Sequence, residues 1–374
     1  VNELTAGVEF LFKKNKITWI KGRGKLLGPN QEGVQQVEVD AAAISGRRVL
    51  LATGSNAVQF PDVAVDNKVV IDNVGALSLA RVPRHLVVVG GGYIGLELGS
   101  IWLRLGAEVT VIEMLPQILP KADGEIAKAL QRSLKKQGMK FHLSTEIESL
   151  QVADDGAKLT LLKGSKSREV ECDRVLMAIG RRPASDDSGI DALGVVSDSQ
   201  HFIKVDENYQ TSVPDIYAIG DLINGPMLAH KAFAEGMVFA ERLAGQDSVL
   251  DYQTIAGVCY THPEMAAVGR TEEQLSEEDI PYRVGRFQFM ANGRARALGE
   301  EEGLVKVLVH ADNSQILGVH IFGARASEMI AEAVTVLGLQ GTSEDVARLV
   351  HAHPTLSETL KEAALAVMGR AIHS

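Results

Sequence analysis

The motif that most constrains the fold of this chain is the glycine-rich run GGGYIG at residues 90–95. An apolar, largely β-branched stretch at residues 86–89 precedes it and predicts a strand, and a helical pattern runs from residue 93 to residue 105. A second predicted strand, at residues 108–112, ends in Glu113. Glycines at the turn of such a strand–helix–strand unit are typical of a dinucleotide-binding site.

Each glycine of this motif has its own role in that chemistry. Gly90 permits the tight turn, Gly92 lets the backbone approach a pyrophosphate, and Gly95 lets the helix pack closely on the strand. The start of the helix offers free N–H groups and a positive dipole end to the phosphates. Glu113 can accept hydrogen bonds from both ribose hydroxyls and would repel a 2′-phosphate, which favours NAD over NADP. The alternative is a purely structural glycine-rich turn.

Composition excludes several classes of protein. The chain has 374 residues, enough for two or three domains, and a hydrophobic content of 45% excludes a disordered chain. A formal charge of −10 without an evident basic face argues against nucleic acid, and no apolar run is long enough to span a membrane. The two cysteines, Cys172 and Cys259, argue against a disulfide scaffold or a metal cluster, and we interpret both as core residues in a reducing compartment.

Periodicity predicts an α/β chain on both sides of this unit. Apolar or alternating runs predict further strands at residues 17–20, 34–39, 48–51, 140–143, 215–218, 304–309 and 316–321. Helical patterns predict helices at residues 126–134, 231–243, 327–339, 343–349 and 357–368. Short antiparallel strands are expected within residues 150–162 and 169–179. Pro61 and Pro83 bracket a connecting segment.

A second candidate site follows the strand predicted at residues 215–218. Gly220 and Asp221 come at its carboxyl end, where α/β folds bind ligands. Asp221 could hold a hydroxylated chain there, and residues 227–231 begin a helix whose N–H groups could face an anion. From the residues alone it is equally open that Asp221 only caps a turn.

A third candidate is the segment HAHPTLSE at residues 351–358. A histidine with a carboxylate that orients one ring nitrogen is a general acid–base pair, and His353 with Glu358 fits this description. Thr355 and Glu358 also match a capping box for the last helix, which would use the glutamate structurally. The two interpretations are not exclusive, because the second carboxylate oxygen can still reach a ring.

These motifs, in this order, resemble the dihydrolipoamide dehydrogenase family of pyridine nucleotide–disulfide oxidoreductases along essentially the whole chain. The likeness is most specific at residues 179–183, 217–221, 227–231, 260–264 and 351–358. The resemblance implies an FAD/NAD-linked reductase architecture with a Rossmann-like NAD domain and a C-terminal α+β dimerisation domain. It also implies oxidation of protein-bound dihydrolipoamide, with electrons passing through a disulfide and FAD to NAD+.

The resemblance also implies a domain division and a set of site residues. The parts are a remnant of the FAD-binding domain (1–55), a connecting segment (56–82), the NAD domain (83–182), a central domain completing the FAD site (183–251) and the dimerisation domain (252–374). The implied NAD contacts are Gly90, Gly91, Gly92, Tyr93, Ile94, Gly95, Leu96, Glu97, Glu113, Ile147 and Gly180. The implied FAD contacts are Gly24, Thr53, Gly54, Ser55, Asp221, Met227, Leu228, Ala229 and His230. His353 is the implied general base, oriented by Glu358, and both act on the partner subunit's disulfide.

The sequence departs from the family's pattern in one respect. It contains neither the family's GxGxxG turn for FAD nor its Cys-x-x-x-x-Cys redox pair, both of which the family places before residue 1 of this chain. The chain also opens on Val1, without a methionine. We therefore expect a fragment of a longer parent enzyme, one that retains FAD weakly or not at all and does not complete the reaction alone.

The resemblance further implies partners and a location. It predicts a homodimer that serves 2-oxo acid dehydrogenase complexes through their lipoyl domains, in the cytoplasm of a bacterium or in the mitochondrial matrix. Thr355, Ser357 and Glu358, together with Glu113 and no basic residue beside it, favour the lipoamide and NAD branch. The alternatives are a glutathione-type, mercuric or transhydrogenase-like reductase, or a flavin-free fragment that binds NAD and dimerises.

Overall fold

The chain forms two compact units, each assembled from two separated stretches of sequence. The computed structural model describes residues 1–60 and 63–373. Pro61, predicted to open the connecting segment, lies outside these described residues, and the finer division of the chain into domains stays a prediction. The first unit joins Val1–Asn56 with Arg181–Leu250, and the second joins Ala57–Gly180 with Asp251–Ser374.

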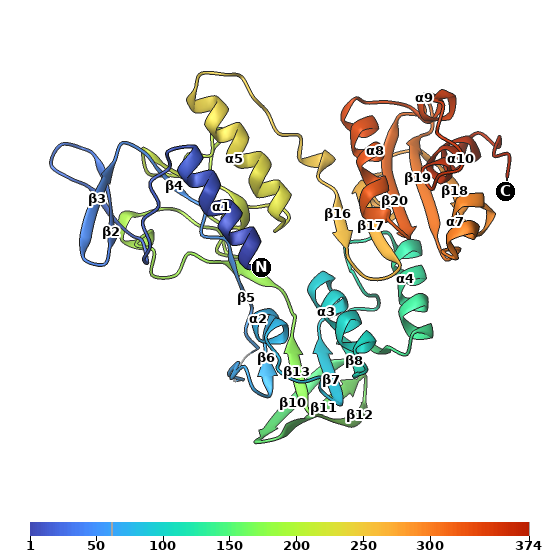
Figure 1. Ribbon diagram of the computed structural model, residues 1–374, viewed down its shortest axis with the longest axis horizontal. Helices are drawn as coiled ribbons and strands as arrows, with labels where there is room; N and C mark the ends of the chain where they lie inside the picture. The colour runs from blue at the N-terminus through green and yellow to red at the C-terminus, as the bar shows by residue number, and fades with distance from the viewer. Residues whose placement is uncertain (61–62, 374) are drawn as a thin grey trace. The chain divides into compact units, whose positions relative to one another are not determined.

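A parallel sheet in the second unit carries the glycine-rich motif (Figure 1). Its strand order is β6-β13-β7-β8-β9, and α3 (Tyr93–Arg104) connects β7 (His85–Val89) to β8 (Glu108–Glu113). The apolar side chains of β7 are almost completely buried, as expected of a parallel strand covered on both faces. The predicted βαβ unit is confirmed. The remaining elements are β6 (Val70–Ile71), α2 (Asn73–Leu77), α4 (Gly124–Lys136), β9 (Lys140–Leu143) and β13 (Arg174–Met177).

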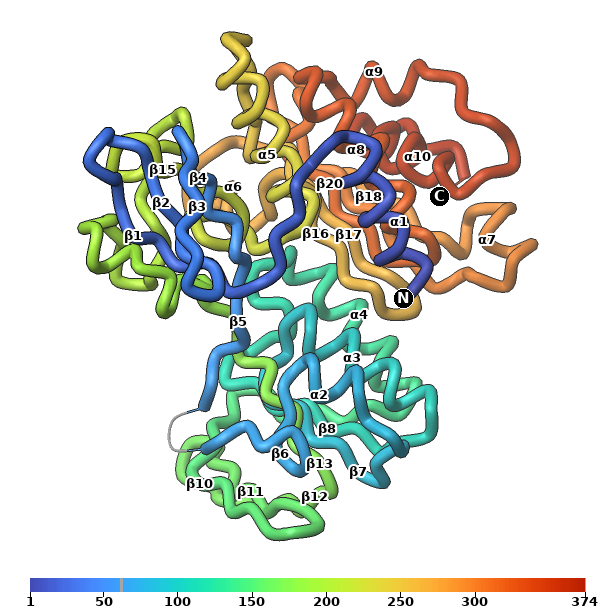
Figure 2. The backbone as a smooth tube through the Cα atoms, turned by 60° about the vertical axis from the view of Figure 1, so that its left-hand side comes forward, coloured from blue at the N-terminus to red at the C-terminus, as the bar shows by residue number. Residues whose placement is uncertain are grey.

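A small antiparallel sheet is inserted between β9 and β13 (Figure 2). It consists of β10 (Glu146–Ala153), β11 (Gly156–Lys163) and β12 (Lys166–Cys172). Burial alternates along β11, so that Ala157, Leu159 and Leu161 join a hydrophobic cluster with residues of β7 and β13. The predicted short antiparallel strands are confirmed within residues 150–162. The prediction for residues 169–179 holds only as far as Cys172, because β13 pairs in parallel with β6 and β7 in the nucleotide-binding sheet. The small sheet packs against one face of that sheet.

The C-terminal stretch of the second unit is an antiparallel sheet in the order β16-β17-β20-β19-β18. Residues alternate across it: Val305 and Val307 pack with α8 and α10 on one face, while Lys306 points to the other face, toward the start of α4. The predicted strands at residues 304–309 and 316–321 are confirmed as antiparallel neighbours. The bounds are η3 (Tyr252–Thr254), β16 (Gly257–Cys259), β17 (Glu264–Gly269), α6 (Glu272–Glu277), β18 (Tyr282–Gln288), η4 (Phe289–Ala291), α7 (Gly293–Leu298), β19 (Leu304–His310), β20 (Ile316–Gly323), α8 (Ala326–Gly338), α9 (Ser343–Arg348) and α10 (Glu358–Val367).

The first unit contains small sheets and the long helix α5. The strand predicted at residues 17–20 is wrong, because this segment follows α1 (Asn2–Lys14) and pairs with no strand among the described residues. Trp19 packs edge-on against Phe12 instead, and an alternating pattern needs a partner strand to become a ladder. The other elements are β1 (Lys25–Pro29), β2 (Gln35–Val39), β3 (Ala42–Gly46), β4 (Val49–Leu51), β5 (Ser55–Ala57), β14 (Arg181–Pro183), η1 (Asp191–Leu193), β15 (Ile216–Ala218), η2 (Gly220–Leu222) and α5 (Ala229–Leu243).

Helix length and polarity bear on the membrane question. Across residues 1–60 and 63–373, no helix combines the length and the apolar character that a membrane span requires.

Candidate functional site

A cavity of about 680 Å³ lies at the carboxyl ends of the parallel strands β7, β8 and β13. Ligands bind at this edge of open α/β sheets because the strand ends and the following helix start converge there. Several predicted NAD contacts line the cavity, namely Gly90, Gly92, Glu113, Ile147 and Gly180. Sequence reasoning missed other lining residues, which come from the segment after β8 and from the start of β10 with the residue before it: Met114, Leu115, Pro120, Thr145 and Glu146.

The three glycines of the motif meet different surroundings. Gly90 has a φ of +106°, and a Cβ there would lie 2.3 Å from the carbonyl oxygen of Ala178. A Cβ on Gly95 would lie 2.2 Å from the carbonyl oxygen of Gly90, so both positions require glycine. A Cβ on Gly92 would meet nothing within 4 Å, and this residue lines the cavity. The open space beside Gly92, at the start of α3, fits a pyrophosphate.

The Glu113 carboxylate accepts two backbone hydrogen bonds, one of them from the glycine-rich turn. Its Oε2 accepts a hydrogen bond from Gly91 N–H at 2.7 Å, and its Oε1 accepts one from Leu115 N–H at 2.8 Å. The residue is only 8% exposed and lines the cavity, so its hydrogen bond stabilises the glycine turn from the side of the cavity. Each oxygen keeps a second lone pair, which leaves acceptor capacity for ribose hydroxyls.

The other predicted NAD contacts at the start of α3 have different surroundings in the structure. Leu96 is fully buried in the hydrophobic core and does not line the cavity beside Gly92, so its side chain packs the helix on the sheet. Glu97 accepts a hydrogen bond from Tyr260 N–H at 2.9 Å, and burial raises the pKa of this carboxyl above its usual range. Ile94 is partly buried and packs against the same core as Leu96.

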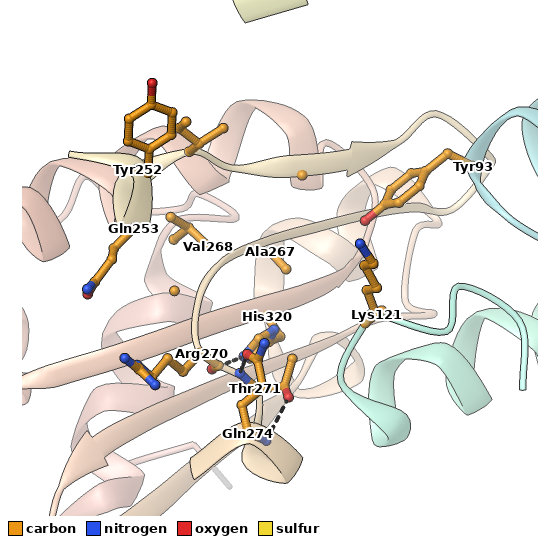
Figure 3. A pocket seen from close by; sticks show the side chains of 14 residues that line it. Tyr93, Lys121, Tyr252, Gln253, Ala267, Val268, Arg270, Thr271, Gln274 and His320 are labelled. Atoms are coloured by element: carbon orange, nitrogen blue, oxygen red, sulfur yellow. Dashed lines mark hydrogen bonds between the residues drawn. The ribbon is translucent and has the colours of Figure 1, made fainter. Parts of the chain in front are cut away.

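Tyr93 faces a different cavity, of about 400 Å³, between the α3 start and the C-terminal sheet (Figure 3). Its hydroxyl and the ammonium of Lys121 point toward one another at one end of this space (Figure 3). Burial raises the pKa of Tyr93 to about 12, so the phenol keeps its proton at neutral pH. Tyr93 lines this second cavity and not the one beside Gly92.

Asp221 lies just after β15, where the sequence places it, and its partner is a predicted residue. The Ser55 hydroxyl donates to Asp221 Oδ2, and Arg181 Nε donates to Ser55 Oγ at 2.7 Å. Arg181 also donates to the Ser55 carbonyl oxygen. Sequence reasoning missed Arg181, although it stands in the segment 179–183 that carried the resemblance. Thr53 lies nearby in the chain, and its hydroxyl donates to the carbonyl oxygen of Ala184 at 2.7 Å.

The start of α5 supplies the other predicted FAD contacts. Leu228 is the N-cap and makes no side-chain cap hydrogen bond, and Met227, Ala229 and His230 surround it in the chain. A carboxylate with a hydroxyl, together with an uncapped helix start, is a donor and acceptor set that fits the hydroxylated chain and polar ring edge of a flavin. Gly24 lies apart from this group in the chain, directly before β1.

His353 and Glu358 lie in contact. His353 Nδ1 is 2.9 Å from Glu358 Oε1, while Glu358 Oε2 accepts a hydrogen bond from Thr355 N–H at 2.8 Å. The predicted capping box does not form, because Ser357 is the N-cap of α10 and the Thr355 hydroxyl donates to the Ala352 carbonyl oxygen. Burial opposes ionisation of Glu358, but the hydrogen bonds from Thr355 N–H and His353 outweigh it and hold the pKa of this carboxyl below its usual range. The exposed imidazole thus has one nitrogen held and the other available.

Both cysteines are free and buried. Burial raises the pKa of the Cys172 thiol to about 12, and it raises that of Cys259 even further. A thiol must lose its proton to act as a nucleophile, so neither sulfur is reactive at neutral pH.

Two protein-family models match the chain. The model "Pyridine nucleotide-disulphide oxidoreductase" matches residues 1–236. The model "Pyridine nucleotide-disulphide oxidoreductase, dimerisation domain" matches residues 255–364. The match to the second model covers the antiparallel sheet and the segment that contains His353 and Glu358.

Curated proteins and solved structures are similar over nearly the whole chain. Dihydrolipoyl dehydrogenase 1, mitochondrial, from Arabidopsis thaliana is 48% identical across 100% of this chain and 74% of its own length. Dihydrolipoyl dehydrogenase from Cupriavidus necator is 47% identical across 100% of this chain and 79% of its own length. The crystal structure of LpdA from Mycobacterium tuberculosis superposes with a TM-score of 0.88 at 25% identity, covering 97% of this chain and 80% of that one.

Proposed function

Since the chain belongs to the pyridine nucleotide–disulphide oxidoreductase family, we propose that it carries the NAD-binding and general-base parts of a dihydrolipoyl dehydrogenase. FAD and NAD are the cofactors of this family. FAD, when bound, relays an electron pair between a dithiol and NAD+. The observation that carries the proposal is the His353–Glu358 hydrogen bond, because a held and exposed imidazole is what deprotonation of a thiol requires.

The cavity beside Gly92 supports the NAD assignment. The pyrophosphate would lie at the start of α3, where Gly92 leaves room and backbone N–H groups point outward. Glu113 would orient the ribose by accepting from its hydroxyls, and its negative charge would oppose a 2′-phosphate. These residues bind and orient the nucleotide without taking part in bond breaking.

The first unit supports the FAD assignment. Asp221 would accept hydrogen bonds from the hydroxylated chain of the flavin, with Ser55 and Arg181 holding its carboxylate in place. The start of α5, from Met227 to His230, would lie against the ring. Together these residues would bind the flavin and orient its ring.

His353 would accept the thiol proton, and Glu358 would keep the ring oriented and stabilise its charged form. Glu358 suits this role because its lowered pKa keeps it ionised at neutral pH. Cys172 and Cys259 are unsuited to the dithiol step, since both are buried with raised pKa values. A polypeptide of only these 374 residues should therefore bind NADH without oxidising dihydrolipoamide.

The proposed assembly is a homodimer built on the region matched by the dimerisation model, residues 255–364. Its proposed partners are the lipoyl domains of 2-oxo acid dehydrogenase complexes. The curated relatives include mitochondrial and bacterial proteins, and the proposed location is the mitochondrial matrix or the bacterial cytoplasm.

The test compares the natural gene product with its His353→Gln variant. We expect the natural protein to reduce NAD+ with dihydrolipoamide, and to bind NADH more tightly than NADPH in calorimetric titration. The variant should keep NADH binding and lose the dithiol reaction. Faster turnover of glutathione disulfide with NADPH would favour the glutathione-type alternative, and absence of any dihydrolipoamide oxidation would contradict the proposal.

A further inference from the structure

Two charged side chains of α5 form an ion pair with no exposure to solvent. Lys231 Nζ lies 2.8 Å from Glu235 Oε1, one helical turn away, and both side chains are 0% exposed. Removing two charges from water is costly, and their mutual attraction offsets that cost only when further hydrogen bonds complete the site. The groups that supply these further hydrogen bonds therefore indicate which part of the structure the pair holds in place.

Two of these further hydrogen bonds lead to Gly220. Glu235 Oε2 accepts from Gly220 N–H at 2.7 Å, and Lys231 Nζ donates to the Gly220 carbonyl oxygen at 2.9 Å. The ion pair thus holds the peptide group on each side of Gly220. The next residue is Asp221, whose carboxylate accepts the Ser55 hydroxyl.

The backbone around Asp221 is shaped to admit the lysine. Gly220 has a φ of +70°, a left-handed conformation that favours glycine. Gly225 has a φ of +128°, and a Cβ there would lie 2.7 Å from Lys231 Cε. Glycine at position 225 therefore leaves room for the lysine stem, and the ammonium group reaches the Gly220 carbonyl oxygen.

We infer that Lys231 and Glu235 are positioning residues for the flavin, which act by fixing the backbone that aims Asp221. This inference rests on the proposed function, which assigns Asp221 to the hydroxylated chain of FAD. A carboxylate binds a polyol well only when its direction is set before the ligand arrives, because loss of that order costs affinity. Ser55 holds the carboxylate itself, while the ion pair holds the main chain behind it.

The experiment uses the natural gene product as holoenzyme, from which FAD is removed and titrated back. Lys231→Met keeps an unbranched apolar stem as far as the ε position and removes both the charge and the donor to Gly220. We expect FAD affinity to fall by about 10- to 100-fold, by analogy with the loss seen when partners behind metal ligands are removed, and the visible flavin spectrum to change. Glu235→Gln should weaken FAD less, since its amide oxygen can still accept from Gly220 N–H.

The double variant Lys231→Met/Glu235→Gln separates positioning from stability. It leaves no buried charge, so thermal stability of the apoprotein should recover relative to Lys231→Met. FAD affinity should stay weak, because the Gly220 carbonyl still lacks its donor. Recovery of affinity in parallel with stability would show a merely structural role and overturn the inference.

Lys306→Met is the matched control, because it breaks another buried ion pair, in the second unit, with Asp123. It should lower stability and leave FAD affinity and spectrum unchanged. If Lys231→Met fails to fold, Glu235→Gln and the double variant still decide the question. Wild-type protein that binds no FAD would contradict the proposed function, whereas wild-type and variant proteins with equal FAD affinity would contradict only this inference.

Discussion

Lys306 Nζ lies 3.0 and 2.8 Å from the two carboxylate oxygens of Asp123, with both side chains almost completely buried. Asp123 also accepts from Glu125 N–H as the N-cap of α4. Glu272, the first residue of α6, lies 2.5 Å from the same ammonium group. One lysine of the antiparallel sheet thus joins that sheet to the helix that covers the nucleotide-binding sheet within the second unit.

Loss of this lysine should destabilise the second unit. Lys306→Met would leave Asp123 buried without its counter-ion, which typically costs about 3–5 kcal/mol. Urea denaturation followed by circular dichroism measures the change in the free energy of unfolding. Lys306→Met/Asp123→Asn should recover part of the loss, since asparagine can still cap α4 through its side-chain oxygen. A single variant as stable as the wild type would show that the pair contributes nothing.

The same cluster predicts loss of stability in acid. Burial opposes the charges of Asp123 and Glu272, but hydrogen bonds from Lys306 outweigh it and hold both pKa values below their usual range. Groups with lowered folded-state pKa values stabilise the fold above the ordinary carboxyl pKa of about 4. This contribution disappears as the pH falls through the lowered values. Denaturation at a series of pH values should show the decline in the wild type and a shallower one in Lys306→Met/Asp123→Asn.

Removal of the Glu113 carboxylate should weaken NADH binding. Glu113→Ala would lose two acceptors for the ribose and the brace on Gly91 N–H, so we expect a loss of about 1–2 kcal/mol in binding free energy. Calorimetric titration with NADH gives the affinity, and titration with NADPH should show reduced discrimination. Glu169→Gln, on the exposed strand β12, is the control. Unchanged NADH affinity in Glu113→Ala would move the ribose contact elsewhere.

Alanine at two motif glycines should separate binding from folding. The Cβ of Gly95→Ala would lie 2.2 Å from the Gly90 carbonyl oxygen, so helix α3 must shift and both stability and NADH binding should fall. Gly92→Ala meets no protein atom within 4 Å, so it should fold normally and lose NADH affinity because its methyl group occupies pyrophosphate space. Thermal unfolding and NADH titration test both variants. Full NADH affinity in Gly92→Ala would contradict the placement of the pyrophosphate.

The His353–Glu358 pair should show unequal effects on dithiol oxidation. His353→Gln removes the base and should cost about 10²–10⁴-fold in turnover of the natural gene product. Glu358→Gln should cost less, because the ring keeps a hydrogen-bond partner and only its orientation and charge stabilisation suffer. Steady-state rates with dihydrolipoamide and NAD+ measure both. A larger effect of the glutamate variant would reverse the assigned roles.

Most features that depend on residues close together in the sequence could be predicted, whereas features that depend on distant residues could not. The βαβ unit was predicted because its pattern is local: a buried strand, a glycine turn and a periodic helix follow one another between residues 86 and 113. The hydrogen bond of His353 to Glu358 spans five residues and was within reach of the same reasoning. The strand at 17–20 failed because alternation says nothing about a partner strand.

The buried ion pairs were not predicted, because sequence reveals which faces are apolar but not which charges meet beneath them. Lys306 and Asp123 are 183 positions apart and are brought together only by tertiary packing. Lys231 and Glu235 had a local signal, an i to i+4 pair on a helix, but such pairs usually lie on the solvated face. Arg181 had its position in a specific segment as a signal, yet its contact with Ser55 joins residues 126 positions apart.

Glu358, the first residue of α10, shares its two oxygens between the N–H of Thr355 in the preceding segment and the ring of His353. One carboxylate therefore holds both the segment that leads into the last helix and the ring of the proposed base. The correct fold of this segment and the correct orientation of the base depend on the same residue. A substitution that disturbs this segment should lower turnover with dihydrolipoamide while nucleotide binding is retained. In the proposed reaction, the folding of the C-terminal segment thus sets the orientation of the base.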